Sequence, residues 1–78
     1  MITIYGKENC TFCDQAKALC KTKGVDYQYF QLDVDFSKPD FIEQMQRLYD
    51  VLPRSMPQIV DDGNYIGGFN ELKKHLTQ

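Results

Sequence analysis

The sequence has no excess of basic residues, and this absence narrows the choice of partners. Its 78 residues include 9 Lys and Arg against 11 Asp and Glu, which gives a formal net charge of −2. Generic binding of nucleic acid needs a basic surface that pairs with phosphates. We therefore expect no nucleic-acid partner.

Long apolar runs are missing as well. No stretch approaches the roughly 18 consecutive apolar residues of a bilayer-spanning helix, and no basic segment leads into an apolar one at the start. We expect no membrane span, no secretory leader and a cytoplasmic location. Since repeats, linkers and low-complexity segments are also absent, residues 1–78 are predicted to form a single domain.

Cysteine is scarce and odd in number, which argues against a secreted disulfide framework. With 3 cysteines one is always left unpaired, whereas a reducing compartment suits a pair that cycles. A structural zinc ion needs four ligands, and beyond Cys10 and Cys13 the chain offers only Cys20 and His75. We therefore predict no metal site.

The cysteines that are present include a closely spaced pair, Cys10-Thr11-Phe12-Cys13, which follows a short apolar run at residues 2–5. Side chains three residues apart on a helical turn lie about 5 to 6 Å apart at Cβ, so a disulfide can form without unfolding. Cys20 lies farther along the same helix, roughly 10 Å from Cys13. The spacing predicts reversible disulfide chemistry for the pair and a place in the core for Cys20.

Position relative to the helix predicts different roles for the two thiols. If the helix begins near Thr11, Cys10 lies at its amino end, where free N–H groups and the macrodipole favour a thiolate. Lys7 adds positive charge nearby. We predict that Cys10 is an exposed nucleophile with a lowered pKa and that Cys13 is a more buried resolving thiol. Alkylation rates against pH test this, and an apparent Cys10 pKa near the free value of about 8.5 would contradict it.

Hydrophobic periodicity and turn residues predict the order β-α-β-α-β-β-α. Strands are expected at residues 2–5, 26–33, 58–60 and 65–66, and helices at 12–23, at 38–52 and after Asn70. Gly24 is the expected C-cap of the first helix, Ser37 the N-cap of the second and Asn70 the N-cap of the third. The segment Asp61-Asp62-Gly63-Asn64 indicates a hairpin turn.

Apolar side chains at helical spacing predict which residues enter the core. The second helix contributes Phe41, Met45, Leu48 and Leu52, and the third contributes Leu72 and Leu76. Acidic residues expected to form a solvated loop are Asp33, Asp35 and Asp40. His75 is expected to be solvated near the end of the last helix, where a cation suits the helix dipole.

Three motifs, in this order, resemble the glutaredoxin family, which has the thioredoxin fold. They are Cys10-Thr11-Phe12-Cys13, then Ser55-Met56-Pro57 ahead of a strand, and Gly67-Gly68-Phe69-Asn70 before the last helix. The resemblance covers essentially the whole chain, and the length is similar to that of the shortest bacterial and viral glutaredoxins. It implies an α/β domain of thioredoxin-like fold, with a four-stranded mixed sheet and three helices.

The resemblance also implies a glutathione site. It implies a cis Met56-Pro57 bond facing the dithiol, with the Met56 N–H and C=O pairing with the cysteinyl backbone of glutathione. The γ-glutamyl end would meet Gly68, Phe69 and Asn70, where helix N–H groups suit its carboxylate.

Further residues of the implied glutathione site lie near the dithiol. Lys7, Arg54 and Gln44 would meet the glycine carboxylate, and Thr11 and Phe12 complete the set. Thr11 and Phe12 replace the Pro and Tyr that are commonest in the family. Phe12 keeps the aromatic wall, and Thr11 restores a backbone N–H, which can change the reduction potential. Loss of that Pro is also associated with holding an iron-sulfur cluster between two protomers.

The activity implied by the resemblance is that of a glutathione-dependent thiol-disulfide oxidoreductase, which reduces protein disulfides and glutathionylated thiols. Cys10 attacks the substrate sulfur and Cys13 resolves the mixed disulfide. Glutathione is then the co-substrate, no cofactor is tightly bound, and the protein is a monomer. Ribonucleotide reductase is a candidate protein target.

Two alternatives stay open at this point. A thioredoxin-like protein would be reduced by a flavoenzyme, and a coupled assay with glutathione and glutathione reductase separates it from a glutaredoxin. An iron-sulfur carrier would be a glutathione-ligated dimer. Anaerobic reconstitution, followed by absorbance and size-exclusion analysis, tests that alternative.

Overall fold

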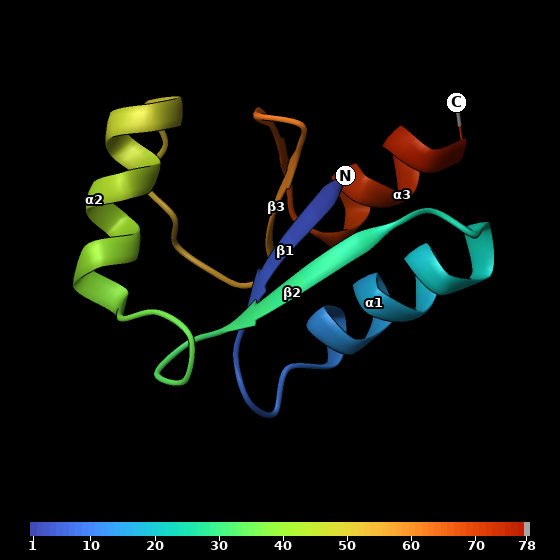
Figure 1. Ribbon diagram of the computed structural model, residues 1–78, viewed down its shortest axis with the longest axis horizontal. Coiled ribbons are helices and arrows are strands. Elements are labelled where there is room, and N and C mark those ends of the chain that lie inside the picture. The colour runs from blue at the N-terminus through green and yellow to red at the C-terminus, as the bar shows by residue number, and fades with distance from the viewer. Residues whose placement is uncertain (78) are drawn as a thin grey trace.

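The computed structural model describes residues 1–77, which contain three helices and four strands in the predicted order (Figure 1). In chain order they are β1 (Ile2–Gly6), α1 (Thr11–Lys23), β2 (Tyr27–Gln31), α2 (Lys38–Tyr49), β3 (Gln58–Asp61), β4 (Asn64–Gly67) and α3 (Phe69–Thr77). None of the helices within residues 1–77 is long and apolar enough to cross a membrane.

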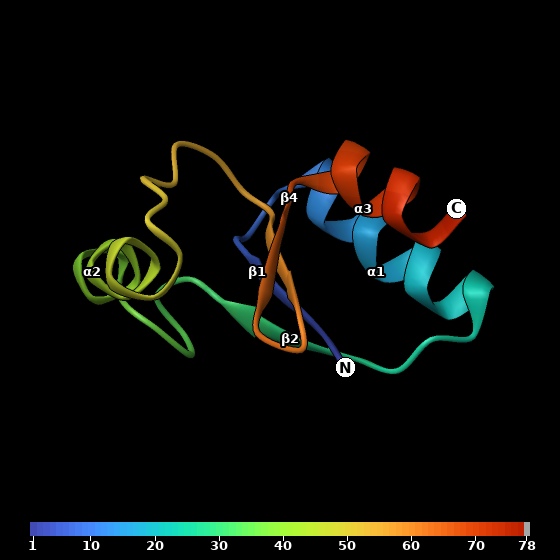
Figure 2. The same ribbon diagram turned by 90° about the horizontal axis from the view of Figure 1, so that it is seen from above.

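The strands form one mixed sheet in the order β2-β1-β3-β4. β1 runs parallel to β2 and antiparallel to β3, and β4 is the antiparallel hairpin partner of β3. Figure 2 shows α1 and α3 on one face of this sheet and α2 on the other. The arrangement of residues 1–77 confirms the four-stranded mixed sheet with three helices that the family resemblance implies.

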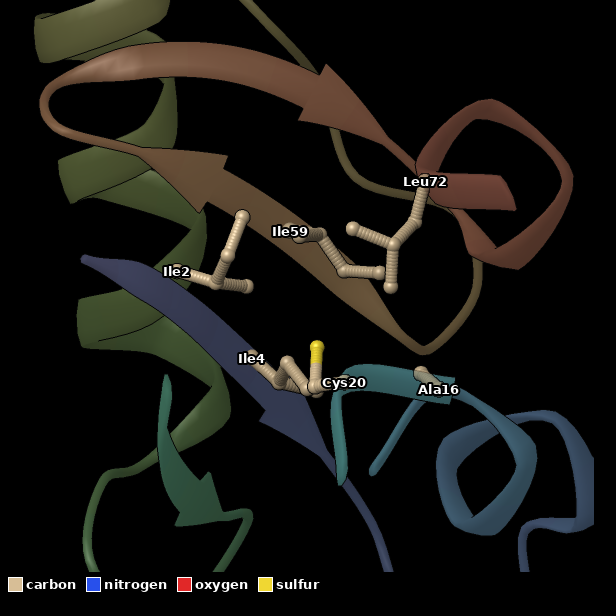
Figure 3. Packing of buried hydrophobic residues seen from close by; sticks show 6 residues of the cluster. All are labelled: Ile2, Ile4, Ala16, Cys20, Ile59 and Leu72. Atoms are coloured by element: carbon tan, nitrogen blue, oxygen red, sulfur yellow. The ribbon is translucent and has the colours of Figure 1, made fainter. Parts of the chain in front are cut away.

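The main core lies between the sheet and the helices α1 and α3 (Figure 3). Its buried side chains are Ile2, Ile4, Ala16, Cys20, Ile59 and Leu72. Side chains alternate along β1, so Ile2 and Ile4 enter this core while Tyr5 faces α2. Cys20 is fully buried, as predicted, and burial raises the pKa of its thiol, which keeps it protonated and unreactive.

Aromatic side chains join α2 to the opposite face of the sheet. The ring centroid of Tyr5 in β1 lies 4.9 Å from that of Phe41 in α2. The ring of Phe36 lies 5.6 Å from Tyr5 and 4.9 Å from Phe41. Phe41 and Met45 are buried, which confirms their predicted place in the core. Large rings therefore fill the space between this helix and the sheet.

The predicted burial of Leu48 and Leu52 is wrong, since each residue is 55% exposed. The inward row of α2 follows steps of four residues, from the buried Phe41 and Met45 to the half-buried Tyr49. At about 100° per residue this row drifts around the helix and leaves Leu48 to one side of it. The helix then ends at Tyr49, so Leu52 lies in the following loop.

Residues in the left-handed region mark the turns that the sequence predicts. Gly24 ends α1 with φ 68°. Between β3 and β4, Asp62 and Gly63 have φ values of 49° and 84°, as a two-residue hairpin turn requires. β2 is shorter than predicted, because Asp33 adopts φ 66° and turns the chain soon after the strand. The three acidic residues expected in a solvated loop are exposed, but only Asp33 and Asp35 lie in the loop, and the prediction is wrong for Asp40, which lies in the first turn of α2.

The two predicted N-caps have different outcomes. Ser37 occupies the N-cap position of α2, although its side chain makes no capping hydrogen bond. The prediction that Asn70 caps α3 is wrong, because the helix begins at Phe69. The Gly68 carbonyl accepts a hydrogen bond from the Leu72 N–H at 3.0 Å, so Gly68 is the N-cap.

Candidate active site

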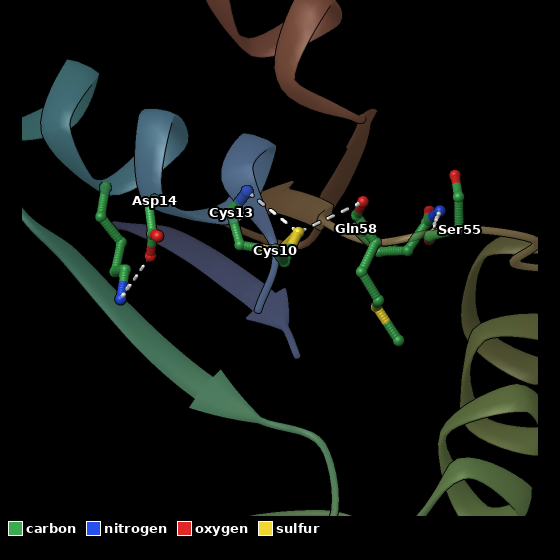
Figure 4. The surroundings of a disulfide bond; sticks show 7 residues. Cys10, Cys13, Asp14, Ser55 and Gln58 are labelled. Atoms are coloured by element: carbon green, nitrogen blue, oxygen red, sulfur yellow. Dashed lines mark hydrogen bonds and ion pairs between the residues drawn. A yellow bond between two sulfur atoms is a disulfide. The ribbon is translucent and has the colours of Figure 1, made fainter. Parts of the chain in front are cut away.

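The two closely spaced cysteines lie where β1 leads into α1. Cys10 is the N-cap of the helix, and Cys13 falls in its first turn. A disulfide joins them across a Cα–Cα distance of 5.2 Å, as the spacing predicts (Figure 4). The disulfide therefore lies at the amino end of a helix.

Hydrogen bonds at the start of α1 favour negative charge on Cys10. The Cys13 N–H donates to Cys10 Sγ at 3.1 Å, which makes the sulfur the side-chain cap of the helix. The Asp14 N–H donates to the Cys10 carbonyl at 3.1 Å and closes the first turn. When the disulfide is reduced, this cap and the helix macrodipole stabilise a thiolate on Cys10 more than a thiol.

Cys13 is the more buried of the two cysteines, as predicted, since it is 1% exposed to solvent and Cys10 is 8% exposed. The prediction that Cys10 is exposed is nevertheless wrong for this disulfide-bonded state, because the chain at Met56 lies against it. The Met56 carbonyl oxygen is 3.8 Å from Cys10 Sγ, and this is a contact only, since a disulfide sulfur carries no hydrogen. A substrate sulfur therefore reaches Cys10 past Met56.

The loop beside Cys10 is held by side chains that no local sequence pattern reveals. Its Met56-Pro57 bond is cis, as the resemblance implies. Gln58 is 6% exposed, and its Nε2 donates to the Ser55 carbonyl at 2.7 Å (Figure 4). Tyr65 Oη in turn donates to Gln58 Oε1 at 2.6 Å. No residue from 1 to 77 accepts a hydrogen bond from the Met56 N–H, so this donor is unpaired.

A pocket of about 190 Å³ lies between this loop and the start of α3. It brings together six of the predicted site residues, and Ser55 and Glu71 complete its lining. The six are Phe12, Met56, Pro57, Gly68, Phe69 and Asn70. The rings of Phe12 and Phe69 lie 6.0 Å apart, and Phe12 is 55% exposed, so the pocket has an aromatic wall open to solvent.

Glu71 is a site residue that the sequence motif did not single out. Its Oε1 accepts a hydrogen bond from the Gly68 N–H at 2.9 Å, as the third residue of a helix does in a capping box. The spacing of three residues from the N-cap is a signal that could have identified it. Gly67 has φ 124°, and a Cβ there would lie 2.8 Å from the Glu71 carboxylate. Because Glu71 already accepts the hydrogen bond of the Gly68 N–H, the N–H groups of Phe69 and Asn70 are the ones left for a ligand.

A larger pocket of about 530 Å³ lies on the α2 side of the same loop. It brings together the two predicted cations, Lys7 and Arg54, with a third cation, Lys38 at the start of α2. Ser55 and Met56 line both this pocket and the smaller one. The two pockets therefore adjoin at Met56, next to the disulfide.

Three other candidate residues lie elsewhere. Thr11, the first residue of α1, is exposed and lines neither pocket. Gln44 also lines neither pocket. It lies beside Tyr5, where burial raises the pKa of the tyrosine and a hydrogen bond with Gln44 partly opposes this rise. His75 is exposed, as expected, and its Nε2 lies 2.9 Å from Asp61 Oδ2, away from the disulfide. Within residues 1–77, no group of three or more His, Cys, Asp or Glu is placed to hold a metal ion.

Comparison of the sequence with known proteins gives a consistent result. The family model described as glutaredoxin matches residues 2–66. Glutaredoxin 3 of Escherichia coli (strain K12) is 36% identical over 72 residues, which cover 91% of this chain and 80% of that protein.

Comparison of the structure points the same way. Glutaredoxin 1 from Francisella tularensis, solved with cacodylate, has a TM-score of 0.81 and 26% identity, covering 99% of this chain and 96% of that one. A buckwheat glutaredoxin solved as a glutathione complex has a TM-score of 0.76 and 24% identity, covering 95% of this chain and 66% of that one. The buckwheat protein supports the fold alone.

Proposed function

Since the chain belongs to the glutaredoxin family and is a thiol-disulfide oxidoreductase, we propose that it uses glutathione as its reducing co-substrate. The observation that carries this proposal is the place of the disulfide, beside the point where two pockets adjoin at Met56. One pocket has the amino end of α3 in its wall, and the other has Lys7 and Arg54. Glutathione has a carboxylate at each end and a thiol between them, so its groups match this arrangement.

The proposed pose places each part of glutathione against a donor. The cysteinyl backbone accepts a hydrogen bond from the unpaired Met56 N–H, in the manner of an added strand. The γ-glutamyl carboxylate faces the Phe69 and Asn70 N–H groups, and the glycine carboxylate faces Lys7 and Arg54. The buckwheat glutaredoxin, which shares the fold, was itself solved as a complex with glutathione.

The proposed exchange begins from the reduced dithiol. The Cys10 thiolate attacks one sulfur of a substrate disulfide, forms a mixed disulfide, and the other substrate sulfur leaves as a thiolate. Cys13 then attacks Cys10 Sγ as a thiolate, which forms the Cys10–Cys13 disulfide and releases the second substrate sulfur. The substrate gains two electrons and two protons as it becomes a dithiol. For a glutathionylated protein, Cys10 attacks the glutathione sulfur and the protein thiolate leaves.

Glutathione closes the proposed cycle. One glutathione thiolate attacks Cys10 Sγ and frees Cys13, and a second attacks the bound glutathione sulfur, which gives oxidised glutathione and the Cys10 thiolate. Glutaredoxin potentials of about −200 to −230 mV lie close to the cytosolic glutathione poise, so supply sets the direction. The proposal places the protein in the cytoplasm as a monomer, with ribonucleotide reductase as one candidate target.

The experiment compares Cys13→Ser with wild type on two substrates, a glutathionylated peptide and a protein disulfide. Removal of glutathione from the peptide should survive, because that exchange needs only Cys10. Reduction of the protein disulfide should fall strongly, because the mixed disulfide loses its resolving thiol. Cys20→Ala is the matched control, since Cys20 is buried in the core, and it should retain both reactions. Loss of both reactions in Cys13→Ser would contradict these roles.

The reductant is tested with wild-type protein in two coupled assays. Glutathione with glutathione reductase should sustain turnover, and thioredoxin reductase should not. Turnover with thioredoxin reductase alone would overturn the proposed use of glutathione and favour a thioredoxin-like protein.

A further inference from the structure

The larger pocket beside Met56 exceeds what the glycine end of glutathione requires. Its volume is about 530 Å³, against about 190 Å³ for the smaller pocket on the other side of Met56. A terminal glycine has the volume of only about two water molecules, at roughly 30 Å³ each. Most of the larger pocket therefore stays open when a glycine carboxylate lies at Lys7 and Arg54.

This pocket is cationic in a molecule that is acidic overall. Lys7, Lys38 and Arg54 line it, and within residues 1–77 no Asp or Glu does. None of these three cations is in an ion pair with another of residues 1–77, although the chain has a net charge of −2. A concave surface with one sign of charge attracts ligands of the opposite sign.

The same pocket also has an apolar side. Ile42 is half-buried there, and Leu52 is 55% exposed. These side chains offer apolar area that a partner can cover, and glutathione has no apolar side chain that could do so. Cations beside apolar residues fit a peptide with an acidic side chain next to an apolar one.

The direction of a bound peptide follows from the proposed function, on which this inference rests. If glutathione lies with its glycine at Lys7 and Arg54, a peptide in its place has the residues after its cysteine at this end. We propose that the basic-apolar pocket, formed by Lys7, Lys38, Leu52 and Arg54 with its remaining lining, binds the segment that follows the reactive cysteine of a protein substrate. It favours an acidic residue next to an apolar one in that segment.

The test uses three short peptides, each with one cysteine as a mixed disulfide with 5-thio-2-nitrobenzoate. The first has Glu and Leu directly after the cysteine, the second has Gln and Ser there, and the third has Glu and Leu directly before it. Pre-reduced protein reacts once: the Cys10 thiolate bonds to the peptide sulfur, and coloured thionitrobenzoate leaves with the electron pair. The reaction needs no glutathione.

Wild-type protein should react about fivefold faster with the first peptide than with the second or third, the factor that one exposed ion pair can contribute. Lys38→Gln should lower this preference about three- to fivefold, and Lys38→Arg should retain it. Leu52→Ser should lower it through lost apolar contact. Lys73→Gln, at an exposed position of α3 outside both pockets, is the matched control. Added salt should weaken the preference of wild type.

Equal rates for the first two peptides would overturn the proposal, and so would an unchanged preference in Lys38→Gln. A preference for the third peptide would also overturn it, because the chain would then run in the opposite direction. A wild-type protein with the expected peptide preference but no turnover with glutathione would support the pocket and overturn the proposed reductant.

Discussion

Gln58 shows how a single buried amide can fix the position of a reactive loop. The side chain accepts a hydrogen bond from Tyr65 Oη and donates one to the Ser55 carbonyl, at 2.6 and 2.7 Å. Ser55 directly precedes Met56, whose carbonyl oxygen contacts Cys10 Sγ. The position of the loop against the disulfide therefore depends on a tyrosine in β4, the strand next to the one that follows the loop.

Tyr65→Phe should lower the free energy of unfolding by about 1 kcal/mol, because it removes the donor to Gln58 Oε1 and keeps the ring. Urea unfolding of the oxidised protein measures this. Tyr27→Phe is the matched control, since within residues 1–77 the Tyr27 hydroxyl has no hydrogen-bond partner and its ring packs against the core. Equal losses in the two variants would show that the hydrogen bond contributes nothing.

The sequence predicts single residues well when the signal is local. The spacing of Cys10 and Cys13 was enough to predict their disulfide, and the seven-residue gap to Cys20 was enough to exclude it. The partners of Gln58 could not be predicted, because they depend on the register of β3 against β4 and on the path of the loop. Lys38 was also missed, because only the fold brings it to the same pocket as Lys7, which lies far from it in the sequence.

Among the elements, the start of α3 carries one negative group, Glu71, and is proposed to bind a second. The Glu71 carboxylate already bonds the Gly68 N–H, and the proposed γ-glutamyl carboxylate would lie beside it. The macrodipole favours an anion at this end of the helix, but two anions also repel each other. In the proposed pose, Glu71 therefore stabilises the helix and weakens the binding of glutathione at the same time.

Glu71→Gln should lower the KM for glutathione about threefold, since it removes one charge at a separation of a few Å in a solvated site. The amide oxygen can still accept from the Gly68 N–H, so the helix start should persist. Steady-state kinetics at low ionic strength measures the change. Glu43→Gln, at an exposed position on α2 outside both pockets, is the control. An unchanged KM would place the γ-glutamyl carboxylate away from α3.

The order and type of the elements follow from the sequence, whereas the end of α2 does not. Gly24 marks the end of α1 because glycine is the usual residue in the left-handed conformation. The residue that caps the end of α2 is instead Asp50, with φ 56°, and an aspartate gives no comparable signal. The helical spacing continued to Leu52 in the sequence, so the helix was predicted to be longer than it is.

At the scale of the whole molecule, two packing layers share one sheet. The aliphatic core lies under α1 and α3, and the rings of Tyr5, Phe36 and Phe41 lie under α2. Tyr5 belongs to β1, and two other residues of the same strand, Ile2 and Ile4, lie in the aliphatic core. The shared strand couples the two layers within residues 1–77, and the single domain over residues 1–78 stays a prediction.

Urea unfolding should accordingly be a single two-state transition. The near-UV signal reports the packed rings, since the chain has 5 Tyr and 5 Phe but no Trp, and the far-UV signal reports the helices. The two midpoints should coincide. A near-UV transition at lower urea concentration would show that α2 separates from the sheet before the rest unfolds.

The cap of α1 links the folding equilibrium to the redox equilibrium. The sulfur that accepts the Cys13 N–H is neutral in the disulfide and charged in the thiolate, and a charged acceptor bonds more strongly. In a closed thermodynamic cycle, any free energy that folding gives to one redox state must reappear as a shift in the reduction potential of the dithiol. Substitutions that change how well the first turn of α1 forms should therefore move the potential, even where no substrate touches them.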